Sequence, residues 1–107
     1  MNVWKPKTVQ DEPEVVLTNW AIVELTSELW AGSTVHFVGY NSLYREGRVT
    51  SPLMSYNPIK KSAITRSGRH YVLSGEPGLN PDASYVFETY KRINKVDTVV
   101  SITKDFY

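Results

Sequence analysis

The stretch Asn80-Pro81-Asp82-Ala83-Ser84-Tyr85-Val86-Phe87-Glu88-Thr89-Tyr90-Lys91-Arg92-Ile93-Asn94 decides the fold, because it carries the clearest helical pattern in the chain. Asparagine is a preferred N-cap residue, and proline fits the first helical position because the N–H that it lacks would have no intrahelical partner there. Apolar residues then recur at helical spacing on one face, at Ala83, Val86, Phe87, Tyr90 and Ile93. The pattern predicts a helix from Pro81 to Ile93 whose apolar stripe packs on a sheet.

Strand patterns precede this helix, and one more follows it. Residues 15–25 are apolar on both faces, which is typical of a central strand. Residues 34–40 alternate, and residues 48–56 are extended but interrupted by Pro52, whose missing N–H indicates a sheet edge or a bulge. Further strands are predicted at residues 60–65, 69–74 and 97–103.

The resulting element order is β-β-β-β-β-α-β. Ser67-Gly68 separates two strand-like runs and predicts a tight hairpin, since glycine adopts a positive φ without strain. We therefore predict an α+β fold: a mostly antiparallel curled sheet or small open barrel of about six strands, with one C-terminal helix packed on it. Residues 1–14 are predicted to form an irregular lead-in whose Asp11, Glu12 and Glu14 face solvent, and residues 15–107 to form a single domain.

The composition restricts the class of protein. The chain has 107 residues, of which 41% are hydrophobic and 21% charged, and this fits one folded domain rather than a disordered or membrane-spanning chain. It contains no cysteine, which excludes disulfides, thiolate metal ligands and a cysteine nucleophile. The first residues lack a signal-peptide pattern, so we expect a cytoplasmic protein. Because no metal-binding motif or phosphate-binding loop is found, we expect neither a metal nor a cofactor.

The net charge is only +1, but the cations gather in the middle of the chain, where residues 41–70 hold six of the twelve lysines and arginines and a single carboxylate. Cations around a tight turn can hold a phosphate or a carboxylate, and tyrosine beside arginine is typical of interfaces. The alternative is a solvated hairpin whose charges discourage edge pairing. The candidate binding residues are Tyr44, Arg45, Arg48, Tyr56, Lys60, Lys61, Arg66, Arg69 and His70.

Two histidines are the candidates for acid–base chemistry near neutral pH. His36 and His70, together with Arg69, would be the catalytic residues of a small metal-independent nuclease or hydrolase. A strand histidine between apolar neighbours, such as His36, is more often a structural residue. The sequence therefore favours a protein that is not an enzyme.

A longer pattern resembles a known group of proteins. It consists of residues 65–78, followed by Asp82-Ala83 and Tyr85-Val86-Phe87, together with residues 46–52. These stretches resemble a group of small uncharacterised bacterial proteins that are carried on phages, integrons and other mobile elements, and the resemblance covers residues 34–94. It implies a bacterial origin and transfers no mechanism.

Three functions follow as hypotheses. The first is a non-enzymatic binding or regulatory module that acts through a protein partner or a homodimer built on a sheet edge. The second is a nucleic-acid-binding module that uses the basic hairpin with Tyr44 and Tyr56, although a net charge of +1 is small for that class. The third is the hydrolase based on His36, His70 and Arg69.

Overall fold

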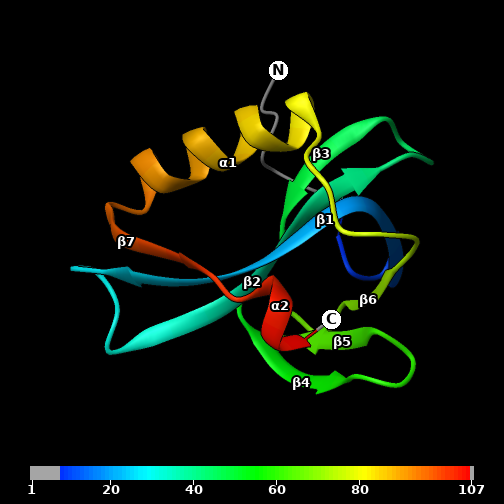
Figure 1. Ribbon diagram of the computed structural model, residues 1–107, viewed down its shortest axis with the longest axis horizontal. Coiled ribbons are helices and arrows are strands. Elements are labelled where there is room, and N and C mark those ends of the chain that lie inside the picture. Colours follow the sequence, from blue (N-terminus) through cyan, green and yellow to red (C-terminus); the bar gives the residue numbers. More distant parts are fainter. Residues whose placement is uncertain (1–7, 107) are drawn as a thin grey trace.

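The computed structural model describes the backbone of residues 8–106 and the side chains of residues 8–104. The strands and helices within this part of the chain are β1 (Glu14–Ser27), β2 (Ser33–Asn41), β3 (Glu46–Val49), β4 (Leu53–Asn57), β5 (Ser62–Thr65), β6 (His70–Leu73), α1 (Pro81–Ile93), β7 (Val96–Ser101) and α2 (Thr103–Phe106). The α+β class and the bounds of the main helix are confirmed. Figure 1 shows α1 lying across the half of the sheet formed by β1, β2 and β3, with β4, β5 and β6 in the other half.

The sheet is open and mixed, and its order is β3-β2-β1-β6-β5-β4, with β7 also paired to β1. The prediction of a mostly antiparallel sheet was wrong, because β6 runs parallel to β1 with Leu73 opposite Leu17. Side-chain alternation, on which the prediction depended, is the same for either strand direction, and here the parallel pairing extends beyond the end of β6. The Ser74 N–H donates to the Leu17 carbonyl at 2.9 Å, and the Gly78 N–H donates to the Trp20 carbonyl at 3.0 Å.

Two strand boundaries also differ from the prediction. The run from residue 48 to 56 is divided into β3 and β4 around Pro52, so the sheet has seven strands rather than about six. The last strand ends at Ser101, and Thr103 begins the short helix α2 instead of continuing the strand. Thr103 Oγ1 accepts a hydrogen bond from the Ile22 N–H at 3.0 Å, which ties this end of the chain to β1.

The long strand β1 contributes to both hydrophobic clusters, as its two apolar faces predicted. In the first cluster Trp20 and Ile22 are fully buried with Phe37, and in the second Leu25 packs beneath α1. The Trp20 indole N–H donates to the Ser74 carbonyl at 3.2 Å, which satisfies its polar edge inside the core. The strand β1 therefore supplies core residues to both hydrophobic clusters.

Helix α1 is fixed at its start by a cap and by close packing. The Asn80 side chain accepts a hydrogen bond from the Ala83 N–H at 3.0 Å, as the N-cap prediction required. On β3, Gly47 lies so close to the helix that a Cβ there would be 2.4 Å from the Asp82 carbonyl oxygen. The helix passes over β3 and brings Tyr90 and the C-cap residue Asn94 towards the loop between β1 and β2.

The predicted lead-in holds a buried ion pair. Of the three carboxylates expected to face solvent, Asp11 and Glu14 are exposed, but Glu12 is only 3% exposed. It lies 2.8 Å from Arg48 on β3 and also accepts a hydrogen bond from Asn41 at 3.2 Å. The expectation for Glu12 was wrong because this long-range pairing gives its charge a partner. The part of the lead-in before Thr8 lies outside the described residues. No helix in residues 8–106 is long and apolar enough to cross a membrane.

Candidate functional site

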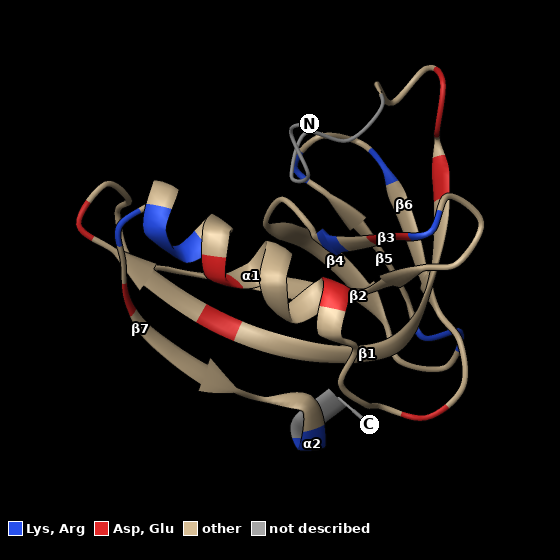
Figure 2. Cartoon of the chain, turned by 90° about the horizontal axis from the view of Figure 1, so that it is seen from above, with Lys and Arg blue, Asp and Glu red and all other residues tan. Residues whose placement is uncertain are grey.

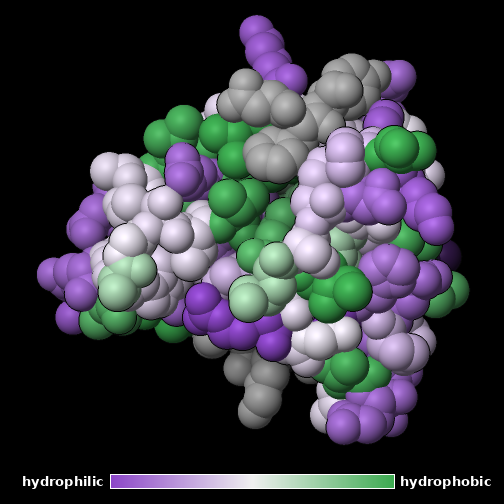
Figure 3. Space-filling view, turned by 90° about the horizontal axis from the view of Figure 1, so that it is seen from below, coloured by the Kyte–Doolittle hydropathy of each residue, from purple (hydrophilic) through white to green (hydrophobic). Residues whose placement is uncertain are grey.

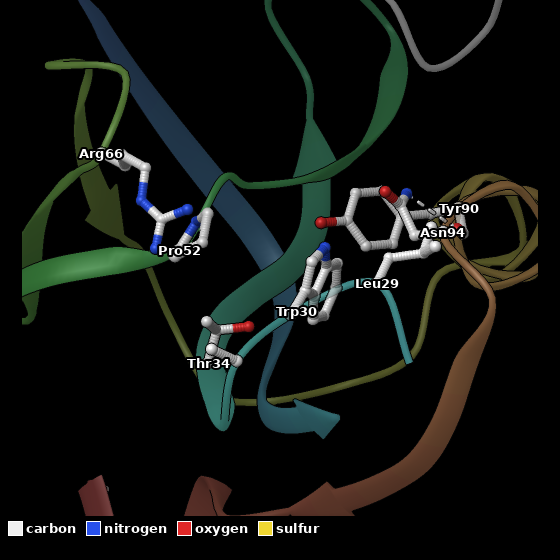
Figure 4. Close-up of a pocket in the computed structure, with 8 residues that line it drawn as sticks. Leu29, Trp30, Thr34, Pro52, Arg66, Tyr90 and Asn94 are labelled. Atoms are coloured by element: carbon white, nitrogen blue, oxygen red, sulfur yellow. Dashed lines mark hydrogen bonds between the residues drawn. The ribbon is translucent and has the colours of Figure 1, made fainter. Parts of the chain in front are cut away.

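A pocket of about 410 Å³ lies where four separate segments meet. These segments are the loop after β1 together with the start of β2, the break between β3 and β4, the turn between β5 and β6, and the C-terminal end of α1. The lining residues are Leu29, Trp30, Ala31, Thr34, Pro52, Arg66, Tyr90 and Asn94. Figure 4 shows Arg66 and Pro52 on one side of the space and the Tyr90 and Asn94 side chains on the other, with Trp30 and Thr34 between them.

Three rings form an aromatic wall of this pocket. The Trp30 ring stacks on His36, with ring centroids 5.8 Å apart and an interplanar angle of 26°. Tyr90 contacts His36 edge-on at 5.8 Å and Trp30 at 6.4 Å. His36 lies fully buried beneath the other two, so Trp30 and Tyr90 are the rings that line the open space.

The hydrogen bonds of His36 determine its tautomer and the role of Thr34. His36 Nδ1 lies 2.7 Å from the Thr50 carbonyl oxygen, which can only accept, so Nδ1 carries the proton. Burial lowers the pKa of His36, the Thr50 hydrogen bond opposes that effect, and the Arg66 charge lowers the pKa further. The ring is therefore neutral at pH 7. Its Nε2 accepts a hydrogen bond at 2.6 Å from the Thr34 hydroxyl, whose lone pairs remain.

Arg66 gives the pocket its charge. It is exposed in the β5–β6 turn, and no carboxylate among the described side chains forms an ion pair with it. Its field reaches the aromatic wall, since it opposes the rise that burial causes in the pKa of Tyr90. No carboxylate lines the pocket in the described part of the chain. The Arg66 side of the space is therefore electropositive.

Two of the other three arginines among the candidate binding residues have structural roles. Arg48 is buried and bonds to Glu12, Glu46 and the Tyr71 hydroxyl, and these neighbours hold its pKa above the usual range against the effect of burial. Arg69 is also buried, and its Nε donates to the Glu12 carbonyl at 2.8 Å. Both arginines bind the lead-in to the sheet, and neither lines the pocket.

The remaining candidate binding residues are dispersed. Tyr44 and Arg45 lie in the β2–β3 turn, while Lys60 and Lys61 lie in the β4–β5 turn, at the opposite end of β5 from Arg66. Tyr56 packs edge-on against Phe37 at 6.1 Å, and His70 lies 3.2 Å from the exposed Glu14. Figure 2 shows lysines and arginines distributed over several elements and interleaved with acidic residues.

The two histidines are not brought together. His36 is opposite Val23 on β1, whereas His70 is opposite Glu14, nine positions earlier on the same strand. A spacing of nine residues along an extended strand separates two side chains by far more than hydrogen-bond length. The predicted catalytic set of His36, His70 and Arg69 therefore forms no common site, and both His36 ring nitrogens are already bonded.

Sequence reasoning missed Trp30, Thr34 and Asn94, and it assigned Tyr90 only to the helix core. Local signals for the pocket were weak, because these residues come from a turn, a strand and a helix end, each of which has an ordinary structural interpretation. Trp30 beside Gly32 in a predicted turn was the best available signal, since a large aromatic residue in a loop often packs against another segment.

Comparisons of the chain with protein-family models, with curated proteins and with solved structures find no match.

Proposed function

We propose that this protein is a non-enzymatic binding module that holds a small organic anion in the pocket between Trp30 and Arg66. The observation that carries the proposal is an exposed guanidinium group without a carboxylate partner among the described side chains, facing an aromatic wall across an open space. A carboxylate or phosphate can pair with such a group through charge-assisted hydrogen bonds.

The walls of the pocket suit the rest of such a ligand. Trp30 offers a ring surface and an indole N–H that makes no hydrogen bond within the described residues, while Leu29 and Pro52 supply apolar contact. A volume of about 410 Å³ lies in the usual range for small-molecule sites. The one histidine next to the pocket, His36, has both ring nitrogens engaged, which favours binding without acid–base chemistry.

The proposal is tested by calorimetric titration with 3-phenylpropanoate, a carboxylate attached to a flat apolar ring. We expect binding to the wild-type protein and at least about tenfold weaker binding to Arg66→Gln, because about 1.4 kcal/mol, one charge-assisted contact, corresponds to tenfold. Arg45→Gln is the matched control, since Arg45 is exposed in a distant turn. Equal affinities of all three proteins, or no binding to any of them, would refute the proposal.

A second candidate function is self-association through β7. This strand pairs only with β1 among the described strands, and Val99 and Val100 are 42% and 51% exposed on it. Natural edge strands usually carry charged residues, proline or a covering segment, whereas β7 has no lysine or proline and a single charged residue, Asp97, near its start. Figure 3 shows separate apolar patches among polar ones on the face seen from below, so pairing of strand edges is better supported there than a broad apolar interface.

Sedimentation velocity over a range of concentrations tests this second function. We expect a dimer that Val100→Lys converts to a monomer, because charge on an edge strand opposes pairing. Ile59→Lys is the control, because Ile59 is 93% exposed in the β4–β5 turn, away from β7. A monomer at every concentration, or equal loss of the dimer in both variants, would show that β7 does not pair.

A further inference from the structure

The pocket has two chemically different ends. Arg66 makes one end cationic, whereas the other end is lined by the uncharged side chains of Tyr90 and Asn94. Between them, the Thr34 hydroxyl hydrogen is committed to His36 Nε2, so Thr34 can offer a ligand only its lone pairs. The hydroxyl is therefore an acceptor for N–H groups rather than a donor to a second anion.

Asn94 and the C-terminal end of α1 also present hydrogen-bond acceptors or partial negative charge at the far wall. The Asn94 side-chain nitrogen donates one of its two N–H groups to the Tyr90 carbonyl at 3.0 Å, and the side-chain oxygen is available as an acceptor. The C-terminal end of a helix carries a partial negative charge. Three cations lie at this end of the helix: Lys91 pairs with Glu88 at 2.6 Å and lies over the Phe87 ring, Lys95 lies 3.8 Å from Glu28, and Arg92 is exposed. None of the three lines the pocket.

The aromatic rings of Trp30 and Tyr90 also favour a cation at this end of the pocket. A cation is attracted to the face of tryptophan or tyrosine, and rings that meet at an angle provide two such faces. Trp30 and Tyr90 are inclined at 52° to each other beside the Asn94 wall. A protonated amine at this end would gain these contacts and would be separated from the guanidinium group of Arg66.

We infer that the ligand is a small zwitterion whose carboxylate pairs with Arg66 and whose ammonium group lies against the Tyr90–Asn94 wall. The inference rests on the proposed binding function and adds a second point of recognition to it. An amino acid with a flat apolar side chain belongs to this class, because it combines both charges with a body that can contact Trp30, Leu29 and Pro52.

Three matched compounds test the inference with the intact chain: L-phenylalanine, 3-phenylpropanoate, which lacks the ammonium group, and 2-phenylethylamine, which lacks the carboxylate. We expect L-phenylalanine to bind about tenfold more tightly than 3-phenylpropanoate, the ratio for one added charged contact. In Arg66→Gln, L-phenylalanine should lose its advantage over 2-phenylethylamine, whereas 2-phenylethylamine itself should bind at least as well as to the wild type, because a repelling cation has been removed.

The outcomes separate the two proposals. If 3-phenylpropanoate binds in an Arg66-dependent way and L-phenylalanine binds no more tightly, the zwitterion inference is wrong and the anion-binding function survives. If none of the three compounds binds, both proposals fail. Tyr90→Phe, which keeps the ring, should preserve the preference for L-phenylalanine, and Tyr90→Leu should reduce it. Equal preference in both variants would contradict the assignment of the ammonium group to this wall.

Discussion

Replacing Gly47 by alanine should detach the start of α1 from β3. A Cβ at this position would lie 2.4 Å from the Asp82 carbonyl oxygen and 2.5 Å from the Ala83 nitrogen, and both are backbone atoms that cannot rotate away. Ordinary contact begins at 3.4 Å, so the helix must retreat by about 1 Å. A gap of that size removes a quarter to a half of the dispersion energy of the contacts that it opens, and Ala83 and Val86 lie in the affected interface.

The expected loss is about 2–3 kcal/mol, at the upper end of the usual cost of overpacking. Thermal unfolding followed by circular dichroism should show a Tm lower by roughly 10–15 °C. Gly39→Ala is the matched control, because its Cβ would meet Leu17 Cβ at 3.1 Å, which requires a shift of only a few tenths of an ångström. If Gly47→Ala destabilises the protein no more than Gly39→Ala does, the described packing of α1 on β3 is incorrect.

Two further changes probe the buried polar groups. Glu12→Gln leaves Arg48 with Glu46 as its remaining carboxylate partner, so urea unfolding should show that the free energy of unfolding falls by about 2–4 kcal/mol. The additional change Arg48→Met should restore much of this free energy. A loss below about 1 kcal/mol for Glu12→Gln would contradict the described pairing. Burial lowers the pKa of His36 from its usual 6.5, so as the pH falls the unfolded chain binds a proton at this histidine before the folded chain does. The contribution of His36 to the free energy of unfolding should therefore be complete above pH 6.5. It should decrease as the pH falls from 6.5 towards the folded pKa, by up to about 1.4 kcal/mol per pH unit. His36→Asn, which can still donate to Thr50, should lack this contribution, and identical pH dependence of the two proteins would show that His36 is not buried and neutral.

The parts of the fold that were predicted correctly are those whose signals are local. The N-cap Asn80, the proline after it and the spacing of Ala83 and Val86 lie within one segment, so the bounds of α1 could be predicted from the sequence. The same is true of the β5–β6 hairpin, where Gly68 has a positive φ of 90°.

The parts that were missed depend on contacts between distant segments. Alternation of side chains identifies β6 but contains no information on whether it runs parallel or antiparallel to β1. The burial of Glu12 depends on Arg48, 36 residues later. In the pocket, Arg66 was predicted to bind an anion, but Trp30 and Tyr90, with which it shares the space, could be placed beside it only by the tertiary fold.

The indole N–H signals in a two-dimensional NMR titration with 3-phenylpropanoate test the central claim most directly. The Trp30 indole N–H lines the pocket, whereas the Trp20 indole N–H is buried and bonded to the Ser74 carbonyl, so one spectrum contains both the probe and its control. The pocket account predicts a saturable shift of the Trp30 signal, which in Arg66→Gln requires at least about tenfold more ligand for half-saturation, while the Trp20 signal stays in place. A Trp30 signal that does not move at any ligand concentration, or that reaches half-saturation at the same ligand concentration in Arg66→Gln as in the wild type, would contradict it.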